Sequence, residues 1–387
     1  MYNRAGGNYS SVSGGAYNTA SASYASVNGG AHNNASGSGS SVTGGYDNTA
    51  AGSSSSVTGG RYNKASGSYS FVGGGGGDEA AKGNEAYSRF SAVLGGLGNT
   101  AGHGADPNNG PNASVSGGFY NVAAGEGASV TGGRYNWAGG EQSSVSGGKD
   151  NRATVEMSSV SGGSDNGAYG TASSVTGGQN NYAFGDHSFI GGGGGWDDYD
   201  GNDARGSHSA ILGGMTNVTD TDSVGVCVSG GAYNHADGSY SSVSGGISNT
   251  ASGSFSSVSG GALNTAGGIF ASVSGGGYNR ASGEGSFVGG GGGDEEIQGN
   301  QAFADYSTIN GGYQNFTGDD TLSDHTIGVR SSISGGHENK ATGQSASVGG
   351  GWRNTASGEE ASVTGGFQNQ AQGNRTSVTG GRDNIAR

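Results

Sequence analysis

Residues 242–256 read SVSGGISNTASGSFS, and the next fifteen residues, 257–271, read SVSGGALNTAGGIFA. In both segments S-V-S-G-G is followed by an asparagine and, two residues later, by an alanine. The valine of this motif, or an isoleucine in its place, recurs 23 times along the 387-residue chain, and 16 of the 22 intervals are 15 residues long. Self-similarity at a fixed period predicts a solenoid, in which each repeat forms one coil of a stack.

Each repeat divides into two short strands joined by two turns. The first strand is S-S-V-[ST], and the glycine pair after it permits a tight turn with positive φ. The second strand contains N-x-A and ends at a turn that bears glycine or serine. Because side chains alternate between the faces of a strand, we expect valine, asparagine and alanine to point inward, and serine, threonine and tyrosine to point outward or sideways. Stacking then pairs each strand with its copies in neighbouring coils.

The asparagine of the motif is predicted to be structural, because a catalytic residue would not recur in every coil. Its amide is expected either to bond the next asparagine along the stack or to hold a turn conformation. The predicted ladder includes Asn18, Asn33, Asn48, Asn63, Asn249 and Asn264.

Composition argues against several classes of protein and partner. The formal net charge of −14 disfavours nucleic acid and anionic membranes as partners. Cys227 is the single cysteine, so no intrachain disulfide forms. No apolar stretch approaches membrane-spanning length, and residues 1–11 contain no hydrophobic signal region. We expect any export signal or anchor to lie outside this sequence, and both ends to be cut from a longer chain.

Three pairs of insertions interrupt the period. The interval grows to 21 residues after Val72, Ile190 and Val288, and the position of the next asparagine places the extra residues in the glycine turn. In the following coil the excess falls in the opposite turn, at 102–113, 220–225 and 318–330. We therefore interpret residues 1–387 as a single continuous solenoid with double-insertion stations at about 73–114, 191–227 and 289–332.

The stations are the candidate binding sites, because loops on rigid scaffolds often carry function. Each begins with five glycines followed by acidic residues; the alternative is that the loops shield the stack or clamp neighbouring chains. The predicted ligand-contact residues are Asp78, Glu79, Trp196, Asp197, Asp198, Asp294, Glu295 and Glu296. Calcium is a narrower form of the same hypothesis, because it prefers carboxylate oxygens. Its candidate ligands are Asp220, Asp222, Asp319, Asp320 and Asp324.

The sequence does not indicate an enzyme. The seven histidines keep no common place in the repeat, and no G-x-x-x-x-G-K-[ST] phosphate loop occurs. Neither a Ser-His-acid triad nor a metal cluster is indicated, so no catalytic residue and no cofactor other than calcium is predicted.

The motif S-V-x-G-G-x-x-N-x-A-x-G-x-x-S, present at 242–256 and 272–286, resembles the YadA-like head repeats of trimeric autotransporter adhesins. The resemblance covers essentially the whole chain, and similar repeats occur in phage tail fibres. It implies an all-β, left-handed parallel β-roll in which three chains form one homotrimeric rod. The thin core of one valine, one alanine and one asparagine per coil also favours a homo-oligomer, because association would bury a second face.

We therefore expect an extracellular structural or adhesive fibre segment that presents a repetitive surface to a host protein or glycan. A phage or viral tail-fibre shaft is the first alternative. The second is an ice- or surface-binding solenoid, because stacked S-V-[ST] strands would form a flat array of hydroxyl groups.

Overall fold

The computed structural model describes residues 2–103, 109–195, 197, 200–320 and 325–387. Within these ranges the regular structure is β, apart from two short 3-10 helices. The chain divides into two compact units, of which the first comprises Met1–Gly192 and Trp196–Asp198 and the second Gly193–Gly195 and Tyr199–Arg387. Among the residues described, no helix is long and apolar enough to cross a bilayer.

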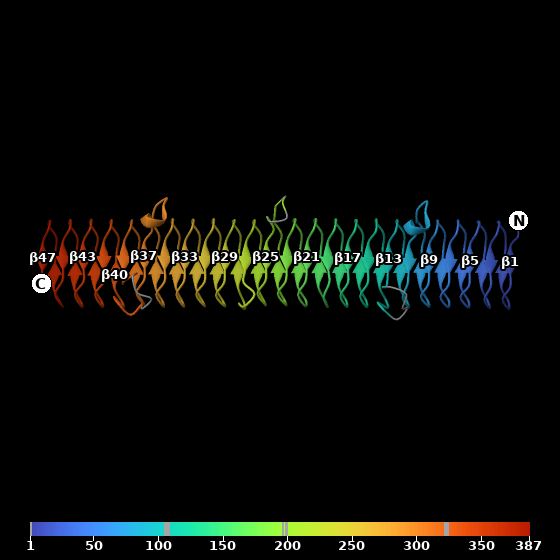
Figure 1. Ribbon diagram of the computed structural model, residues 1–387, viewed down its shortest axis with the longest axis horizontal. Coiled ribbons are helices and arrows are strands. Elements are labelled where there is room, and N and C mark those ends of the chain that lie inside the picture. The colour runs from blue at the N-terminus through green and yellow to red at the C-terminus, as the bar shows by residue number, and fades with distance from the viewer. Residues whose placement is uncertain (1, 104–108, 196, 198–199, 321–324) are drawn as a thin grey trace. The chain divides into compact units, whose positions relative to one another are not determined.

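The first unit alternates two kinds of two-residue strand. Each even-numbered strand, from β2 (Ser11–Val12) to β24 (Phe189–Ile190), consists of the core valine or isoleucine and the residue before it. Each odd-numbered strand, from β1 (Arg4–Ala5) to β23 (Tyr182–Ala183), ends at the core alanine. Equivalent strands of successive coils pair in parallel, which makes an even-strand sheet and an odd-strand sheet (Figure 1). This arrangement confirms the predicted parallel β-solenoid of about 15-residue coils.

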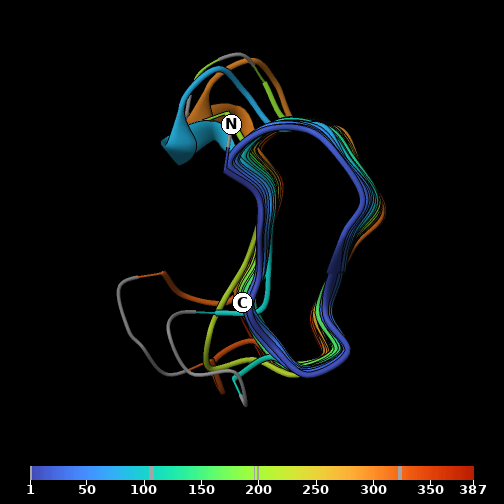
Figure 2. The ribbon, with the colours of Figure 1, turned by 90° about the vertical axis from the view of Figure 1, so that its right-hand side faces the viewer.

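The second unit repeats this plan, with odd-numbered strands from β25 (Asp203–Ala204) to β47 (Ile385–Ala386) and even-numbered strands from β26 (Ala210–Ile211) to β46 (Ser377–Val378). The core alanine is replaced by threonine in β27 (Val218–Thr219) and β39 (Phe316–Thr317). Seen along the stack, the coils of each unit share one outline, whose long sides are the two sheets and whose short sides are the turns (Figure 2).

The interior of a regular coil holds more residues than the three that the sequence predicts. Val243, Asn249 and Ala251 have no exposed surface, as expected from strand alternation. The residue before the even strand, usually serine or alanine, is buried in most coils as well, so the prediction that serines face outward is wrong at this position. There the turn bends the chain inward; in one coil, for example, the buried Ser55 donates its hydroxyl to the Gly52 carbonyl at 2.8 Å.

The asparagine amide joins each coil to the next at the glycine turn. Asn249 Oδ1 accepts the backbone N–H of Asn264 at 3.0 Å. Its Nδ2 donates to the Gly245 carbonyl in the same coil at 2.9 Å and to the Gly261 carbonyl in the next coil at 3.0 Å. Thus one side chain serves both of the roles expected of it, the ladder and the turn.

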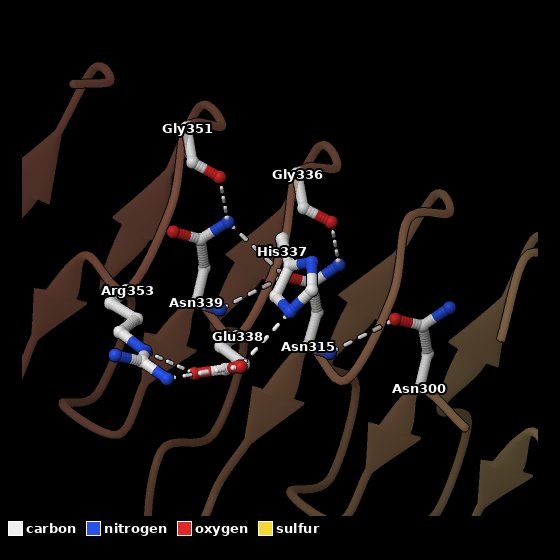
Figure 3. A network of polar contacts seen from close by, with 8 residues as sticks. All are labelled: Asn300, Asn315, Gly336, His337, Glu338, Asn339, Gly351 and Arg353. Carbon is white, nitrogen blue, oxygen red and sulfur yellow. Dashed lines mark hydrogen bonds and ion pairs between the residues drawn. The ribbon is translucent and has the colours of Figure 1, made fainter. Parts of the chain in front are cut away.

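The same bonds recur along the stack. Figure 3 shows them from Asn300 to Asn315 and Asn339, with Asn339 Nδ2 donating to the Gly351 carbonyl. Asn18, Asn33, Asn48, Asn63 and Asn264 each accept the N–H of the next asparagine and donate to two glycine carbonyls.

Only the second glycine of the pair is required by the backbone. Gly246 has a φ of +86°, and a Cβ there would lie 2.1 Å from the Gly261 carbonyl oxygen and 2.5 Å from Asn249 Nδ2. A Cβ at Gly245 would meet no atom within 4 Å. Positive φ is also not confined to glycine, since Ser248 (+55°) and Phe255 (+59°) adopt it in the same coil. Their backbone N–H groups bond carbonyls of the preceding coil, which stabilises this otherwise disfavoured conformation.

The two glycines provide a matched pair of substitutions. Gly246→Ala should lower stability by at least about 2 kcal/mol, because it adds backbone strain and displaces the Asn249 amide. Gly245→Ala should change the free energy of unfolding by less than about 1 kcal/mol. Thermal melting followed by circular dichroism measures both, and equal shifts in Tm for the two variants would contradict this account of the turn.

Candidate functional site

The station of the first unit begins where β10 (Phe71–Val72) ends. After Gly76 the chain leaves the coil, forms the 3-10 helix η1 (Ala80–Lys82) and returns at β11 (Glu85–Ala86). Lys82 Nζ lies 2.9 Å from Asp78 and 3.7 Å from Glu79, so the predicted ligand-contact carboxylates pair within their own loop. The hydrogen bond from Lys82 lowers the pKa of Asp78, and the same bond raises the pKa of Lys82.

The corresponding loop of the second unit joins β36 (Phe287–Val288) to β37 (Gln301–Ala302) through the 3-10 helix η2 (Glu296–Gln298). Gln298 stands where the first unit has Lys82, and its side-chain oxygen accepts the Asp294 N–H at 2.9 Å. Asp294, Glu295 and Glu296 are exposed, and no ion pair within the described part of the chain involves them. The two loops therefore share a backbone path but differ in charge.

The remaining predicted loop residues have different surroundings, as far as the structure describes them. Asp197 is exposed, and its backbone carbonyl accepts the Asn180 side-chain amide at 2.9 Å. The carboxylate of Asp220 accepts the Thr221 N–H at 2.7 Å, while Asp222 and Asp320 are exposed and Asp319 is half-buried. Trp196, Asp198 and Asp324 lie outside the described residues. Within the ranges described, no three His, Cys, Asp or Glu side chains gather as metal ligands.

The insertions leave the coil on one side only. In the first unit the η1 loop departs from the glycine turn, and the described residues of the 102–113 insertion depart from the opposite turn; both lie beside the odd-strand sheet (Figure 2). The described residues of the two corresponding insertions in the second unit do the same (Figure 2). Within the described ranges, no insertion residue of these stations lies over the outer surface of the even-strand sheet.

The even-strand sheet presents a nearly uniform surface of hydroxyl groups. In several places these bond along the stack, as between Ser41 and Ser56 at 3.1 Å and between Ser257 and Ser272 at 3.2 Å. At the station of the first unit the surface becomes apolar, because Phe71 and the exposed Leu94 replace hydroxyl side chains. Cys227 occupies a serine position of this sheet in the second unit, next to Ser242 on β30 (Ser242–Val243).

The odd-strand sheet presents varied side chains. Lys64 pairs with Glu85 of the next coil at 2.7 Å, and a hydrogen bond to Glu85 raises the pKa of Tyr87 to about 12. At the glycine turn beside this sheet in the second unit, Arg353 contacts Glu338, which also bonds His337 at 2.9 Å (Figure 3). No site was predicted on the outer face of the odd-strand sheet, although the residue between asparagine and alanine changes from repeat to repeat and was a signal for it.

Exposed aromatic side chains line the turns. In the turn that precedes the even strands, Tyr240, Phe255 and Phe270 stack with ring centroids 5.1 Å apart. The tyrosines before the asparagines form a second column, in which Tyr120 and Tyr135 stack at 5.8 Å. Because stacked rings cover each other's faces, mainly their edges remain for contact with a partner.

Comparison with known proteins assigns no family. No protein-family model matches the sequence, and no curated protein is significantly similar to it. The functional interpretation therefore rests on the repeat and on the surfaces that it creates.

The η1 loop should be dispensable for folding. Deleting residues 77–82 restores a 15-residue interval between Val72 and Val93 and keeps Gly75, whose carbonyl accepts the Asn63 amide at 3.0 Å. We expect a Tm within a few degrees of the parent, because η1 contains no buried residue. As a control, deleting 244–249 removes Gly246 and Asn249 from a regular coil and should lower Tm strongly. Unfolding of the 77–82 variant would show that the loop is an architectural clamp.

Proposed function

We propose that the chain is a segment of an extracellular structural or adhesive fibre, of the kind its resemblance to trimeric adhesin heads implies. The observation that supports this most is the contrast between the two sheets of each unit. One sheet bears mostly small hydroxyl side chains and, within the described residues, no station loop, while the other bears charged and aromatic side chains flanked by the loops. Such a division suits a scaffold that packs through one surface and presents the other.

In this proposal copies of the chain associate through their even-strand sheets into a homotrimer. Short serine and threonine side chains allow two sheets to approach closely, and Phe71, Leu94 and Phe287 supply apolar contacts. Each copy carries a net charge of −14, so the acidic loops must stay outside the assembly. Their position beside the odd-strand sheet meets that requirement.

The odd-strand sheet then faces a host surface protein or glycan, on a cell surface or on a virion. The outward side chains of this sheet differ from coil to coil. Each group of neighbouring coils therefore presents a different set of side chains to a partner, on the same backbone. This arrangement is compatible with both an adhesin head and a phage tail-fibre shaft. We assign the chain no catalytic role.

A second candidate function follows from the hydroxyl surface of the even-strand sheet. If the chain stays monomeric, that sheet is free, and its ordered hydroxyls could bind ice or another regular surface. The serine-to-serine bonds along the stack favour this candidate, because they hold the hydroxyls in a fixed array.

The native cysteine tests the assembly directly. Cys227 lies on β28 (Cys227–Val228) of the even-strand sheet, so the trimer should protect it from maleimide. Native mass should be about three times 37.4 kDa. In a Cys227→Ser background, Thr250→Cys on the odd-strand sheet should instead react freely. A folded monomer with a freely reacting Cys227 would overturn the trimer, and a thermal-hysteresis assay on that monomer would then test ice binding.

A further inference from the structure

The outer surface of the odd-strand sheet changes character near the end of the first unit. Four successive strands, β17 (Trp137–Ala138), β19 (Arg152–Ala153), β21 (Gly167–Ala168) and β23, place Trp137, Arg152, Gly167 and Tyr182 side by side in register. The next outward positions, two residues further along, hold Gly139, Thr154, Tyr169 and Phe184. Two aromatic groups thus flank one arginine.

Two glycines allow the rings to lie against the sheet. A Cβ at Gly139 would be 2.2 Å from Trp137 Nε1, so the indole covers that glycine. A Cβ at Gly167 would be 2.2 Å from Tyr169 Cε2, so the phenol covers this one. The Tyr169 ring also lies 5.3 Å from Phe184 and 6.2 Å from Tyr182. Because Gly139 and Gly167 have no side chain, the rings of Trp137 and Tyr169 can pack directly on the backbone of the sheet.

Hollows lie on both sides of Arg152. The first, of about 340 Å³, is lined by Tyr135, Trp137, Arg152 and Thr154. The second, of about 380 Å³, is lined by Asp150, Arg152, Asp165, Asn166, Tyr169 and Tyr182. Because Arg152 borders both, the hollows form a row that follows the stacking direction.

The polar side chains of this row include positive and negative groups, and the guanidinium of Arg152 is available to bond a ligand. Asp150 pairs with Lys149 at 3.0 Å, and Asp165 accepts the Ser164 hydroxyl at 2.5 Å. Within the residues described, Arg152 forms no ion pair. Aromatic walls with a few convergent donors and acceptors suit a ligand that has both apolar faces and many hydroxyl groups. Sugars have this chemistry, whereas two carboxylates disfavour a ligand that is purely anionic.

We propose that this row binds a linear, uncharged glycan that runs along the stack. Sugar rings would pack against Trp137 at one end and Tyr169 at the other, while Arg152, Asp150 and Asp165 bond hydroxyls between them. Coils repeat about every 4.8 Å, so the two aromatic walls are about 10 Å apart, roughly the length of two hexose units. The inference deepens the proposed function, on which it rests for the outward orientation of the odd-strand sheet.

The test uses the 387-residue chain and four probes: cellohexaose, chitohexaose, mannohexaose and a hexamer of galacturonic acid. Isothermal titration should detect at least one uncharged hexasaccharide. Trp137→Ala and Tyr169→Ala should each weaken its binding at least tenfold, and Arg152→Ala about fivefold. Trp137→Phe, which keeps a ring against Gly139, should retain most of the affinity. The control Trp352→Ala removes an exposed tryptophan of the second unit and should leave binding unchanged.

The proposal is overturned if none of the uncharged probes binds, if only the galacturonic acid hexamer binds, or if binding is unaffected by Trp137→Ala. Native mass and Cys227 reactivity, measured on the same samples, separate this inference from the proposed assembly. If the chain is a trimer and binds no uncharged glycan, the glycan site is refuted and the proposed assembly stands. If the chain is a monomer and binds a glycan through Trp137, the trimer is refuted and the glycan site stands.

Discussion

The bonds of the buried asparagine amide are the constraint on which the rest of the molecule depends. A buried amide without partners is costly, and a coil this thin buries too little apolar surface to offset that cost. Asn249 avoids this cost because its amide accepts one backbone N–H and donates to two carbonyls. The same bonds fix the glycine turn and the register of the next coil. Each coil thereby positions its successor, and the 15-residue period follows.

The freedom of the outer surface is a consequence of that fixed interior. Once valine, asparagine, alanine and the buried serine are placed, the outward positions of both sheets can change without disturbing the stack. Serine fills most of these positions on one sheet, whereas the other varies from Lys64 to Trp137 and Tyr182. Insertions occur at the turns, where added residues interrupt no strand pairing. Structural positions and variable surface positions are therefore separated within the described coils.

The periodic features of the fold could be predicted from the sequence, because spacing alone determines them: the parallel solenoid, the inward valine and asparagine, and the turns that take the insertions. Features that depend on the exact course of the turns or on how a side chain lies against the backbone could not be. The burial of Ser241, the positive φ of Phe255 and the covering of Gly167 by Tyr169 belong to this class. Acidic composition drew attention to Asp78, whose partner Lys82 became evident only from the loop geometry. Chain number and family remain predictions.

Hydrogen exchange at the Asn264 backbone amide, compared between the parent chain and Asn249→Leu, tests the central role of the asparagine most directly. Leucine cannot accept the Asn264 N–H, and it leaves the Gly245 and Gly261 carbonyls without the amide that bonds them. Our account predicts that protection at Asn264 falls at least tenfold, with a smaller loss in the coils on either side. Unchanged protection at Asn264 together with an unchanged Tm would show that the stack is held by its backbone pairing alone.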